Sequence, residues 1–337
     1  MRSAPVTTLA AVIVTYNRLD ALRQTLSRVL DEAVDRVHVV DNASTDGTAD
    51  WLAAQDDPRL RVLQLSENGG GAGGFTAGLE AAMGGADPAA WCVLFDDDAW
   101  PQPGTFERFR RDAADLDPDA TGPGALGALA AAVSYPNGTV CEMNRPNLNP
   151  FWHAPVLART LLGGRSQFKV TDADLAPTAP PRSLDVASFV GFFVSRGAVR
   201  GLGLRPEAGL FLYGDDVLYS LRLRRAGLRM ELWPQLRFTH DCGTMGEGFV
   251  YRPLWKIYYH CRNGVQIARE AAGPIVFPAA LAYYTLVWWR RGRCCSPESR
   301  SLYRRMMWEG LRDGLRGHRG RNDRLHGTVL APARPNR

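Results

Sequence analysis

Lysine is nearly absent from this chain of 337 residues, which contains only Lys169 and Lys256. The formal net charge of +5 therefore comes almost entirely from arginine. Basic charge alone does not predict nucleic-acid binding, because none of the recognised nucleic-acid-binding modules is present. Apolar residues make up 45% of the chain and charged residues 22%, which is the balance of an ordinary folded protein.

Cysteine is also sparse, and the six cysteines form no CxxC pair and no regular framework. In a chain of this length, that pattern favours reduced thiols in a cytosolic protein over a disulfide scaffold. No signal-peptide cleavage site follows the first apolar run, so we predict that Leu9–Thr15 is a strand. The longest apolar run, residues 275–289, is short for a bilayer span and contains Pro278.

The first half of the chain alternates strand-like and helix-like segments. Strands are predicted at residues 9–15, 36–41, 60–65 and 91–96, with helical signals between them. This alternation predicts a parallel sheet with helices on both faces, whose ligands bind beyond the carboxyl ends of the strands. The motifs TYNR, DNAS, ENGG and DDD each follow one of these strands, so we expect them to meet in one cleft.

From about residue 117 the pattern loosens. Residues 184–195 are predicted to form another strand, and residues 228–233 a further one. Residues 215–227 are predicted to form a helix, and two more helices are expected around residues 254–270 and 298–315. No internal repeat is visible.

Three consecutive aspartates, Asp96, Asp97 and Asp98, end the fourth predicted strand. Like charges repel one another and are costly to bury. Two carboxylates two positions apart at a strand end can both face one divalent cation, which removes the repulsion. Mg²⁺ and Mn²⁺ are commonly held by one or two carboxylates and substrate phosphates. We interpret the triplet as part of a metal site, with a solvated acidic turn as the alternative.

The segment GGGAGG, residues 69–74, matches the G-x-G-x-x-G pattern, but five of its six residues are glycine, so composition alone explains the match. A dinucleotide fingerprint normally follows the first strand, whereas this segment follows the third. We interpret it as a backbone loop that needs positive φ and approaches a nucleotide diphosphate. A nicotinamide-dependent oxidoreductase is the alternative.

A second acidic pair, Asp215 and Asp216, opens a predicted helix after FLYG. One acid is enough to cap a helix N-terminus, so the other is free to act as a general base toward a hydroxyl group. Farther along, His240 follows a predicted strand in the motif FTHD, where it is either a structural residue or a metal ligand.

Together, the segments TYNR, VVDNASTDGT, ENGGGAGGF and FDDD resemble the N-terminal half of glycosyltransferase family 2, over roughly residues 9–120. The resemblance continues through YGDDVLYSLRLRRAG and FTHD, and it looks most like the bacterial galactofuranosyl- and rhamnosyltransferase branches. It implies the GT-A fold, a mostly parallel α/β sheet with helices on both faces, followed here by a helical extension. It also implies metal-dependent, inverting transfer from a nucleotide-sugar donor.

The resemblance assigns roles to individual residues. Asp216 would be the catalytic base with Asp215 beside it, and Asp96, Asp98 and His240 would hold Mn²⁺ or Mg²⁺. Asp41 would lie toward the nucleotide base. The nucleotide-sugar pocket would be lined by Thr15, Tyr16, Asn17, Arg18, Asp41, Asn42, Asn68, Gly69, Gly73, Asp96 and Asp97. Many family members carry Ala-Arg-Asn in the third loop, where this chain has AGGFTAG, so Arg18 is a candidate to supply the phosphate contact instead.

The acceptor side has weaker signals. Phe192, within SFVGFF, and Trp152 are candidate acceptor contacts, with burial in a strand and ordinary packing as the alternatives. We expect UDP-galactofuranose or dTDP-rhamnose as the donor, with UDP-hexoses as further candidates. The acceptor is expected to be a glycan, including one carried on a polyprenyl diphosphate.

The C-terminal tail combines the aromatic run at residues 275–289 with many arginines. This composition suits either a segment that lies in a membrane interface or a core helix with a basic end. We therefore predict a GT-A domain over residues 1–250 and a helical, arginine-rich region over residues 251–337, located in the cytoplasm at the inner face of the membrane. A non-catalytic membrane-surface protein is a further alternative. WKIYYHCRNG, residues 255–264, also resembles the family branch, but its chemistry predicts no role.

Overall fold

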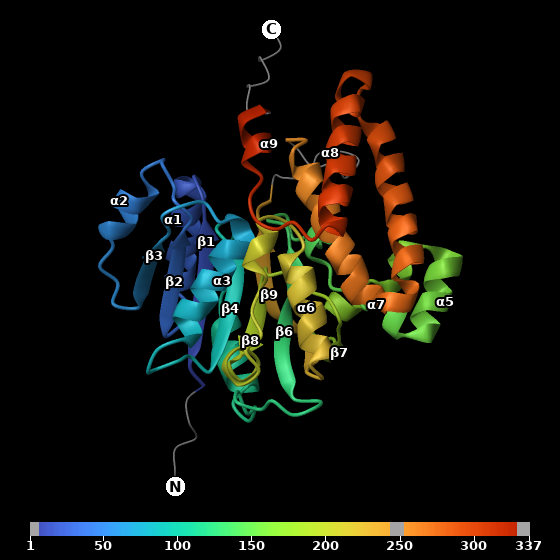
Figure 1. The fold of residues 1–337 in the computed structure, drawn as a ribbon. Coiled ribbons are helices and arrows are strands. Elements are labelled where there is room, and N and C mark those ends of the chain that lie inside the picture. Colours follow the sequence, from blue (N-terminus) through green and yellow to red (C-terminus); the bar gives the residue numbers. More distant parts are fainter. Residues whose placement is uncertain (1–6, 243–252, 329–337) are drawn as a thin grey trace. The chain divides into compact units, whose positions relative to one another are not determined.

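The computed structural model describes residues 7–242 and 253–328 (Figure 1). Its internal contacts divide the chain into two compact units. Unit 1 comprises Met1–Ala208 and Asp215–Cys242, and unit 2 comprises Gly209–Gly214 and Gly243–Arg337. Residues 209–214 therefore belong with the C-terminal region, although they interrupt unit 1 in the sequence.

Unit 1 is built on a mixed sheet with the strand order β3-β2-β1-β4-β8-β6-β9-β5, and β7 pairs with β9. Strands β1, β2, β3 and β4 pair with one another in parallel. Strand β8 pairs antiparallel with both β4 and β6, and β9 pairs parallel with β6. This mostly parallel arrangement confirms the predicted fold class. The strands are β1 (Leu9–Thr15), β2 (Arg36–Asp41), β3 (Leu60–Gln64), β4 (Trp91–Asp96), β5 (Ala99–Pro101), β6 (Leu126–Ser134), β7 (Arg182–Ser183), β8 (Phe192–Ser195) and β9 (Arg229–His240).

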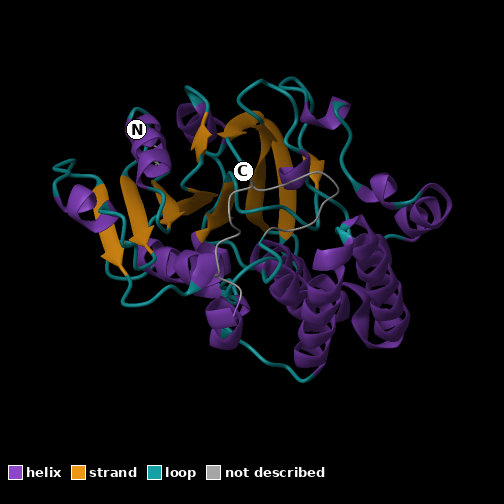
Figure 2. Ribbon diagram, turned by 90° about the horizontal axis from the view of Figure 1, so that it is seen from above, coloured by secondary structure: helices purple, strands orange, loops and turns teal. Residues whose placement is uncertain are grey.

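Helices flank this sheet on both sides (Figure 2). Alternate residues of β1 point to opposite faces: Ile13 packs in one core with α1, α2 and α4, whereas Val12 packs in the other with α3 and α6. Burial on both faces explains why β1 and β4 are continuous apolar runs. The helices of unit 1 are α1 (Leu19–Leu30), α2 (Thr48–Ala53), α3 (Gly70–Met83), α4 (Thr105–Asp112), α5 (Ala154–Gly163) and α6 (Asp215–Arg225).

Two strand predictions need correction. Residues 184–195 do not form one strand, because only Phe192–Ser195 is extended and paired. The preceding Gly191 adopts a left-handed φ of 69°, which interrupts the extended run. The strand predicted at residues 228–233 instead continues to His240, across a register shift in its pairing with β6.

The prediction that GGGAGG is a loop of positive-φ glycines is wrong. Helix α3 begins at Gly70, the only residue of 69–74 with a positive φ. A Cβ atom at Gly74 would lie 2.4 Å from Cγ1 of Val14, and one at Gly78 would lie 2.4 Å from Cγ1 of Val12. These two glycines therefore allow α3 to pack closely against β1.

Unit 2 contains α7 (Lys256–Arg291), α8 (Pro297–Leu315) and the short α9 (Asp323–Thr328). Non-helical backbone at Gly273, followed by Pro274, divides α7 into two helical segments. The second segment and α8 lie side by side (Figure 1). Both expected helices are present, and the first is longer than predicted. By length and composition alone, the helical stretch Lys256–Cys294 could cross a membrane.

Arg262 and Asn263, from the WKIYYHCRNG segment, are buried and bind the backbone of residues 209–214. Arg262 Nη2 donates to the carbonyl of Leu210 (2.7 Å), and Asn263 Nδ2 donates to the carbonyls of Leu212 (2.6 Å) and Tyr213 (2.8 Å). Phe211 and Tyr213 have left-handed φ angles of 63° and 65°, which bulky residues rarely adopt. Arg262 and Asn263 thus hold the backbone of residues 209–214, the segment of unit 2 that directly precedes Asp215 in the sequence.

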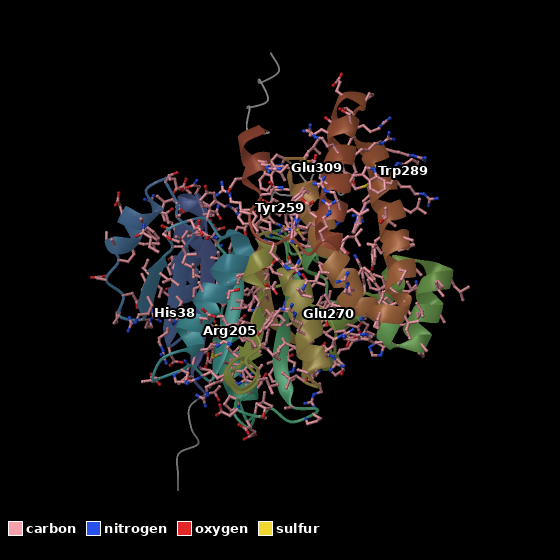
Figure 3. The ribbon with its side chains drawn as sticks, in the orientation of Figure 1. His38, Arg205, Tyr259, Glu270, Trp289 and Glu309 are labelled. Atoms are coloured by element: carbon pink, nitrogen blue, oxygen red, sulfur yellow. The ribbon has the colours of Figure 1, made fainter. Side chains whose placement is uncertain are left out.

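His38 on β2 is a buried titratable group of unit 1 (Figure 3). Its side chain is 6% exposed, and its Nε2 has no hydrogen-bond partner. Burial, together with the charges of Arg36 and Arg61, lowers the pKa of His38 to about 4. The folded chain therefore holds His38 neutral over a pH range in which the unfolded chain protonates it.

We expect this histidine to destabilise the fold as the pH falls from about 6.5 to about 4, because only unfolded His38 then binds a proton. The shift corresponds to at most about 3 kcal/mol of unfolding free energy. Urea unfolding of wild-type and His38→Gln chains at pH 7 and pH 4.5 tests this, and the variant should lose less stability in acid. His318→Gln, at an exposed side chain of unit 2, is the control. Equal losses in wild type and His38→Gln would contradict the expectation.

Candidate active site

The carboxyl ends of three neighbouring strands bring the sequence motifs of unit 1 together. Thr15, the last residue of β1, pairs with Asp41 at the end of β2, and Val14 pairs with Asp96 at the end of β4. Thr15 Oγ1 also donates a hydrogen bond to Asp97 Oδ2 (2.7 Å). TYNR, DNAS and FDDD therefore form one polar edge of the sheet, as the sequence predicts.

The three aspartates have different surroundings. The guanidinium of Arg18 spans two of them, with Nη1 3.0 Å from Asp97 and Nη2 2.9 Å from Asp98. Burial raises the pKa of Asp97 to about 6, although Arg18 and the Thr15 hydroxyl favour its charged form. Burial and the neighbouring Asp98 carboxylate raise the pKa of Asp96 to about 7. Arg18 is thus occupied by carboxylates in this structure.

Pairing of β5 with β9 places His240 beside Asp98. Ala99 is the register partner of His240, and the amide of Asp241 donates to the backbone carbonyl of Asp98 (2.9 Å). His240 Nε2 lies 3.2 Å from Asp98 Oδ1. Burial disfavours a charged imidazole, but the hydrogen bond and charge of Asp98 outweigh it and raise the pKa of His240 to about 10. The same contact, with Arg18, lowers the pKa of Asp98 despite its burial.

Asp96, Asp98 and His240 could hold one metal ion, because each offers a ligand atom within 4.8 Å of the other two. Carboxylate oxygen and imidazole nitrogen suit Mn²⁺, and carboxylate oxygen also suits Mg²⁺. Asp97 is turned instead to Thr15 and Arg18. The sequence places Asp97 in the nucleotide-sugar pocket and not among the metal ligands, and in the structure it lies outside this ligand group.

Asn144 orients His240, and sequence reasoning missed it. Its Oδ1 lies 2.7 Å from His240 Nδ1, and its Nδ2 donates to Ser188 Oγ (2.9 Å), which turns the amide oxygen toward the imidazole. The His240 Nδ1 hydrogen therefore points at Asn144, and Nε2 faces the aspartates. Asn144 lies in an irregular stretch without motif or periodicity, so the sequence carries no signal for it.

Asp215 and Asp216 open helix α6, as predicted. Asp216 Oδ1 accepts a hydrogen bond from the amide of Val217 (2.7 Å). Burial raises the pKa of Asp216 to about 6. Burial, the Asp216 carboxylate and the Asp96 carboxylate raise the pKa of Asp215 well above its usual range. The structure therefore places Asp215 near enough to Asp96 for the two carboxyl groups to interact electrostatically.

Hydrogen bonds connect the loop that follows β1 with the loop that follows β2. Asn17 has a left-handed φ of 53°, and its Oδ1 accepts from the amide of Thr45 (2.7 Å). Asp41 Oδ1 accepts from the amide of Ser44 (2.9 Å), whereas Asp41 Oδ2 is buried without a hydrogen-bond partner. A buried acceptor without a hydrogen-bond partner is unusual in a folded protein. Tyr16 is 42% exposed beside this group.

The start of α3 is tied to the same edge of the sheet. Asn42 accepts from the amide of Gly69 (3.0 Å) and donates to the carbonyl of Gly70 (2.7 Å). Asn68 Oδ1 accepts from the amide of Gly70 (2.8 Å). Gly73 lies inside the helix, where a Cβ atom would meet nothing within 4 Å. The structure thus brings Asn42, Asn68 and Gly69 together and gives Gly73 no contact that requires glycine.

The two candidate acceptor residues differ. Phe192 is fully buried, and its ring packs 5.7 Å from that of Phe189 and 6.0 Å from that of Tyr219. The acceptor role predicted for Phe192 is therefore replaced by a core role. Trp152 is half-buried, and the guanidinium of Arg225 lies 6.0 Å from its ring centre.

Comparison with known proteins supplies the family. The model of "Glycosyl transferase family 2" matches residues 10–165. The chain is 31% identical over 248 residues to the galactofuranosyltransferase GlfT1 of Mycobacterium tuberculosis, a match that covers 69% of this chain and 70% of that protein. This chain belongs to glycosyltransferase family 2. It is a nucleotide-sugar-dependent glycosyltransferase.

The fold of this family 2 glycosyltransferase is similar to those of solved glycosyltransferase structures. S. aureus TarS in complex with UDP-GlcNAc matches with a TM-score of 0.55 and 13% identity, over 96% of this chain and 84% of that one. The mannosyltransferase PcManGT from Pyrobaculum calidifontis, in complex with GDP-Man and Mn²⁺, matches with a TM-score of 0.51 and 16% identity, over 91% and 85%. The family assignment removes the basis for the oxidoreductase alternative.

Proposed function

We propose that this enzyme is a metal-dependent, inverting glycosyltransferase that transfers galactofuranose or rhamnose from a UDP- or dTDP-linked donor to a hydroxyl group of a cell-envelope glycan. The carrying observation is the group Asp96, Asp98 and His240, together with the position of Asp215 at the start of α6, where burial and the charges of Asp216 and Asp96 raise its pKa. The 31% identity to a galactofuranosyltransferase supports galactofuranose as the first candidate sugar. An acceptor carried on a polyprenyl diphosphate fits the same proposal.

The residues present fit a divalent metal. Two carboxylates and an imidazole whose Nε2 faces them are suitable ligands for Mn²⁺, and Asn144 holds the other ring nitrogen as an outer hydrogen-bond partner. A bound Mn²⁺ or Mg²⁺ would supply positive charge that stabilises the departing nucleoside diphosphate. We assign Asp96 additionally to the ribose, and Asp41 to the nucleotide base through its unpartnered Oδ2.

Asp216 is proposed as the general base. A carboxyl group with a pKa of about 6 is ionised at neutral pH and still accepts a proton more readily than an ordinary aspartate. Its carboxylate takes the proton of the acceptor hydroxyl, whose oxygen forms a bond to the anomeric carbon of the donor. The bond from that carbon to the diphosphate oxygen breaks on the opposite face, so the configuration inverts. Burial and the Asp216 carboxylate also raise the pKa of the neighbouring Asp215 well above its usual range.

Replacement of Asp216 by Asn should abolish transfer while donor binding survives, because the amide keeps the shape of the side chain and cannot accept the proton. We expect turnover to fall by about 100-fold or more. Single-turnover transfer from UDP-galactofuranose and calorimetric donor binding measure the two effects. Asp20→Asn, at a side chain that is 95% exposed, is the control. Near-normal turnover of Asp216→Asn would make the base assignment wrong.

Replacement of Asp98 by Ala should weaken metal binding by roughly 10- to 100-fold, since one ligand is lost and His240 loses its partner. Calorimetry with Mn²⁺ alone, and with UDP in the presence and absence of Mn²⁺, measures this change. Asp20→Ala is the matched control. If Asp98→Ala binds Mn²⁺ as tightly as wild type does, the metal lies elsewhere.

The second half of α7 and helix α8 are proposed to lie in the cytoplasmic membrane interface. Ile275 is 92% exposed, and Trp308 is 52% exposed. A hollow in this part of unit 2 is lined by apolar side chains that include Phe277, Leu281, Leu286, Trp289 and Trp308. The guanidinium groups of Arg293 and Arg304 lie 4.6 and 5.8 Å from the ring centre of Trp289. Aromatic side chains beside arginines suit a surface of anionic lipid.

The double variant Ile275→Ser and Trp308→Ser should bind anionic vesicles about tenfold or more weakly than wild type, because two large apolar side chains no longer enter the lipid. Sedimentation with phosphatidylglycerol–phosphatidylcholine vesicles measures the binding. Leu161→Ser with Leu162→Ser, which alters two side chains of α5 that are 78% and 92% exposed, is the matched control. Equal binding by both double variants would contradict the proposed surface.

A further inference from the structure

Two cysteines, Cys141 and Cys242, lie close to His240. Cys141 Sγ is 3.9 Å from Cys242 Sγ, although the two residues are 101 positions apart in the sequence. Cys141 precedes a short 3-10 turn that follows β6, and Cys242 comes two residues after β9, the parallel neighbour of β6. Cys141 is fully buried and Cys242 is half-buried. The proposed glycosyltransferase chemistry uses neither thiol.

Cys141, Cys242 and His240 each offer a ligand atom within 4.8 Å of the other two. Two thiolates bound to one tetrahedral zinc ion, at roughly 2.3 Å each, lie about 3.8 Å apart. The observed sulfur–sulfur distance of 3.9 Å already matches this spacing. Thiolate sulfur together with imidazole nitrogen selects Zn²⁺ over Mn²⁺ or Mg²⁺. Cys141, Cys242 and His240 thus form a ligand set suited to Zn²⁺, next to the Asp96, Asp98 and His240 set suited to Mn²⁺ or Mg²⁺.

The imidazole of His240 belongs to both ligand sets. Its Nε2 faces Asp98 Oδ1, and its Nδ1 hydrogen is directed at Asn144 Oδ1, which also accepts from the Cys141 thiol (2.9 Å). A neutral imidazole has one nitrogen with a free lone pair and one that carries hydrogen. If Nδ1 binds a metal, Nε2 keeps its hydrogen and donates to Asp98. If Nε2 binds a metal, Nδ1 keeps its hydrogen and donates to Asn144.

We propose that Cys141, Cys242 and His240 Nδ1 form a Zn²⁺ site, and that occupation of this site excludes metal binding at His240 Nε2. Asn144 is the alternative partner of the same ring nitrogen and of the same thiol, so zinc binding replaces its two hydrogen bonds. Zinc binding itself is independent of the proposed transferase reaction. The exclusion rests on the proposed function, because it assumes that Asp96, Asp98 and His240 hold the catalytic metal.

Zinc binding is tested on the full-length, reduced, chelator-stripped chain without donor or manganese. One Zn²⁺ should bind per chain, and Co²⁺ used as a probe should show a thiolate charge-transfer band. Cys141→Ser and Cys242→Ser should each bind Zn²⁺ at least about tenfold more weakly. Cys294→Ser, at an exposed cysteine, is the matched control and should bind as wild type does. Unchanged zinc affinity in both site variants, or a Co²⁺ adduct without the thiolate band, overturns the site.

A measurement on wild type keeps the test valid if a cysteine variant does not fold. Zn²⁺ should slow alkylation of Cys242 and leave that of Cys294 unchanged, as followed by peptide mass spectrometry. Equal rates at Cys242 with and without Zn²⁺ overturn the site.

The exclusion has a separate readout. One equivalent of Zn²⁺ per chain should weaken Mn²⁺ binding to wild type at least about tenfold, and it should weaken Mn²⁺ binding to Cys141→Ser markedly less. Zinc that binds through the thiols without altering manganese affinity overturns the exclusion alone. A chain that shows the thiolate band but never binds Mn²⁺ refutes the proposed catalytic metal while the zinc site stands.

Discussion

The arrangement of this enzyme depends on how it compensates buried carboxylates at one edge of its sheet. Asp97 and Asp98 are 3% and 6% exposed, and an isolated buried carboxylate is too costly to retain its charge. One arginine, Arg18, contacts both, and each has a further partner: Thr15 for Asp97 and His240 for Asp98. Removal of Arg18 would leave Asp97 without a cationic partner and Asp98 with His240 alone, so this arginine links the compensation of both buried charges.

The compensation of Asp98 depends on a residue that lies far from it in the sequence. His240 is 142 residues from Asp98 in the sequence, and only the antiparallel pairing of β5 with β9 brings them together. Strand β9 is fixed from the other side by its parallel pairing with β6. The second half of the sheet therefore positions an imidazole with the precision of backbone hydrogen bonds, as a ligand of a metal site requires. A proton on Nε2 then holds the place that a divalent cation would take.

Short-range patterns predicted the N-terminal strands and the polar edge, because alternation and strand-end motifs are local properties of the sequence. The same reasoning assigned Asp98, Asp216 and His240 only with the help of the family resemblance. It failed for GGGAGG, whose glycines are needed where α3 meets Val12 and Val14, a contact that depends on tertiary packing. It failed for Asn144 and Arg262, whose roles are hydrogen bonds to partners far away in the sequence. Such partners leave no periodicity to detect.

The most constrained atom group of the site is the imidazole of His240, because every neighbour competes for one of its two nitrogens. Asp98 accepts at Nε2, while Asn144 accepts at Nδ1 with Cys141 beside it. Both neighbours accept hydrogen bonds from the ring, and the Asp98 carboxylate raises the pKa of His240 to about 10 despite its burial. A metal can enter on one face only by displacing the hydrogen there, and the hydrogen on the other face must then stay. The choice of metal is therefore decided at the ring, by whether oxygen or sulfur ligands complete the coordination.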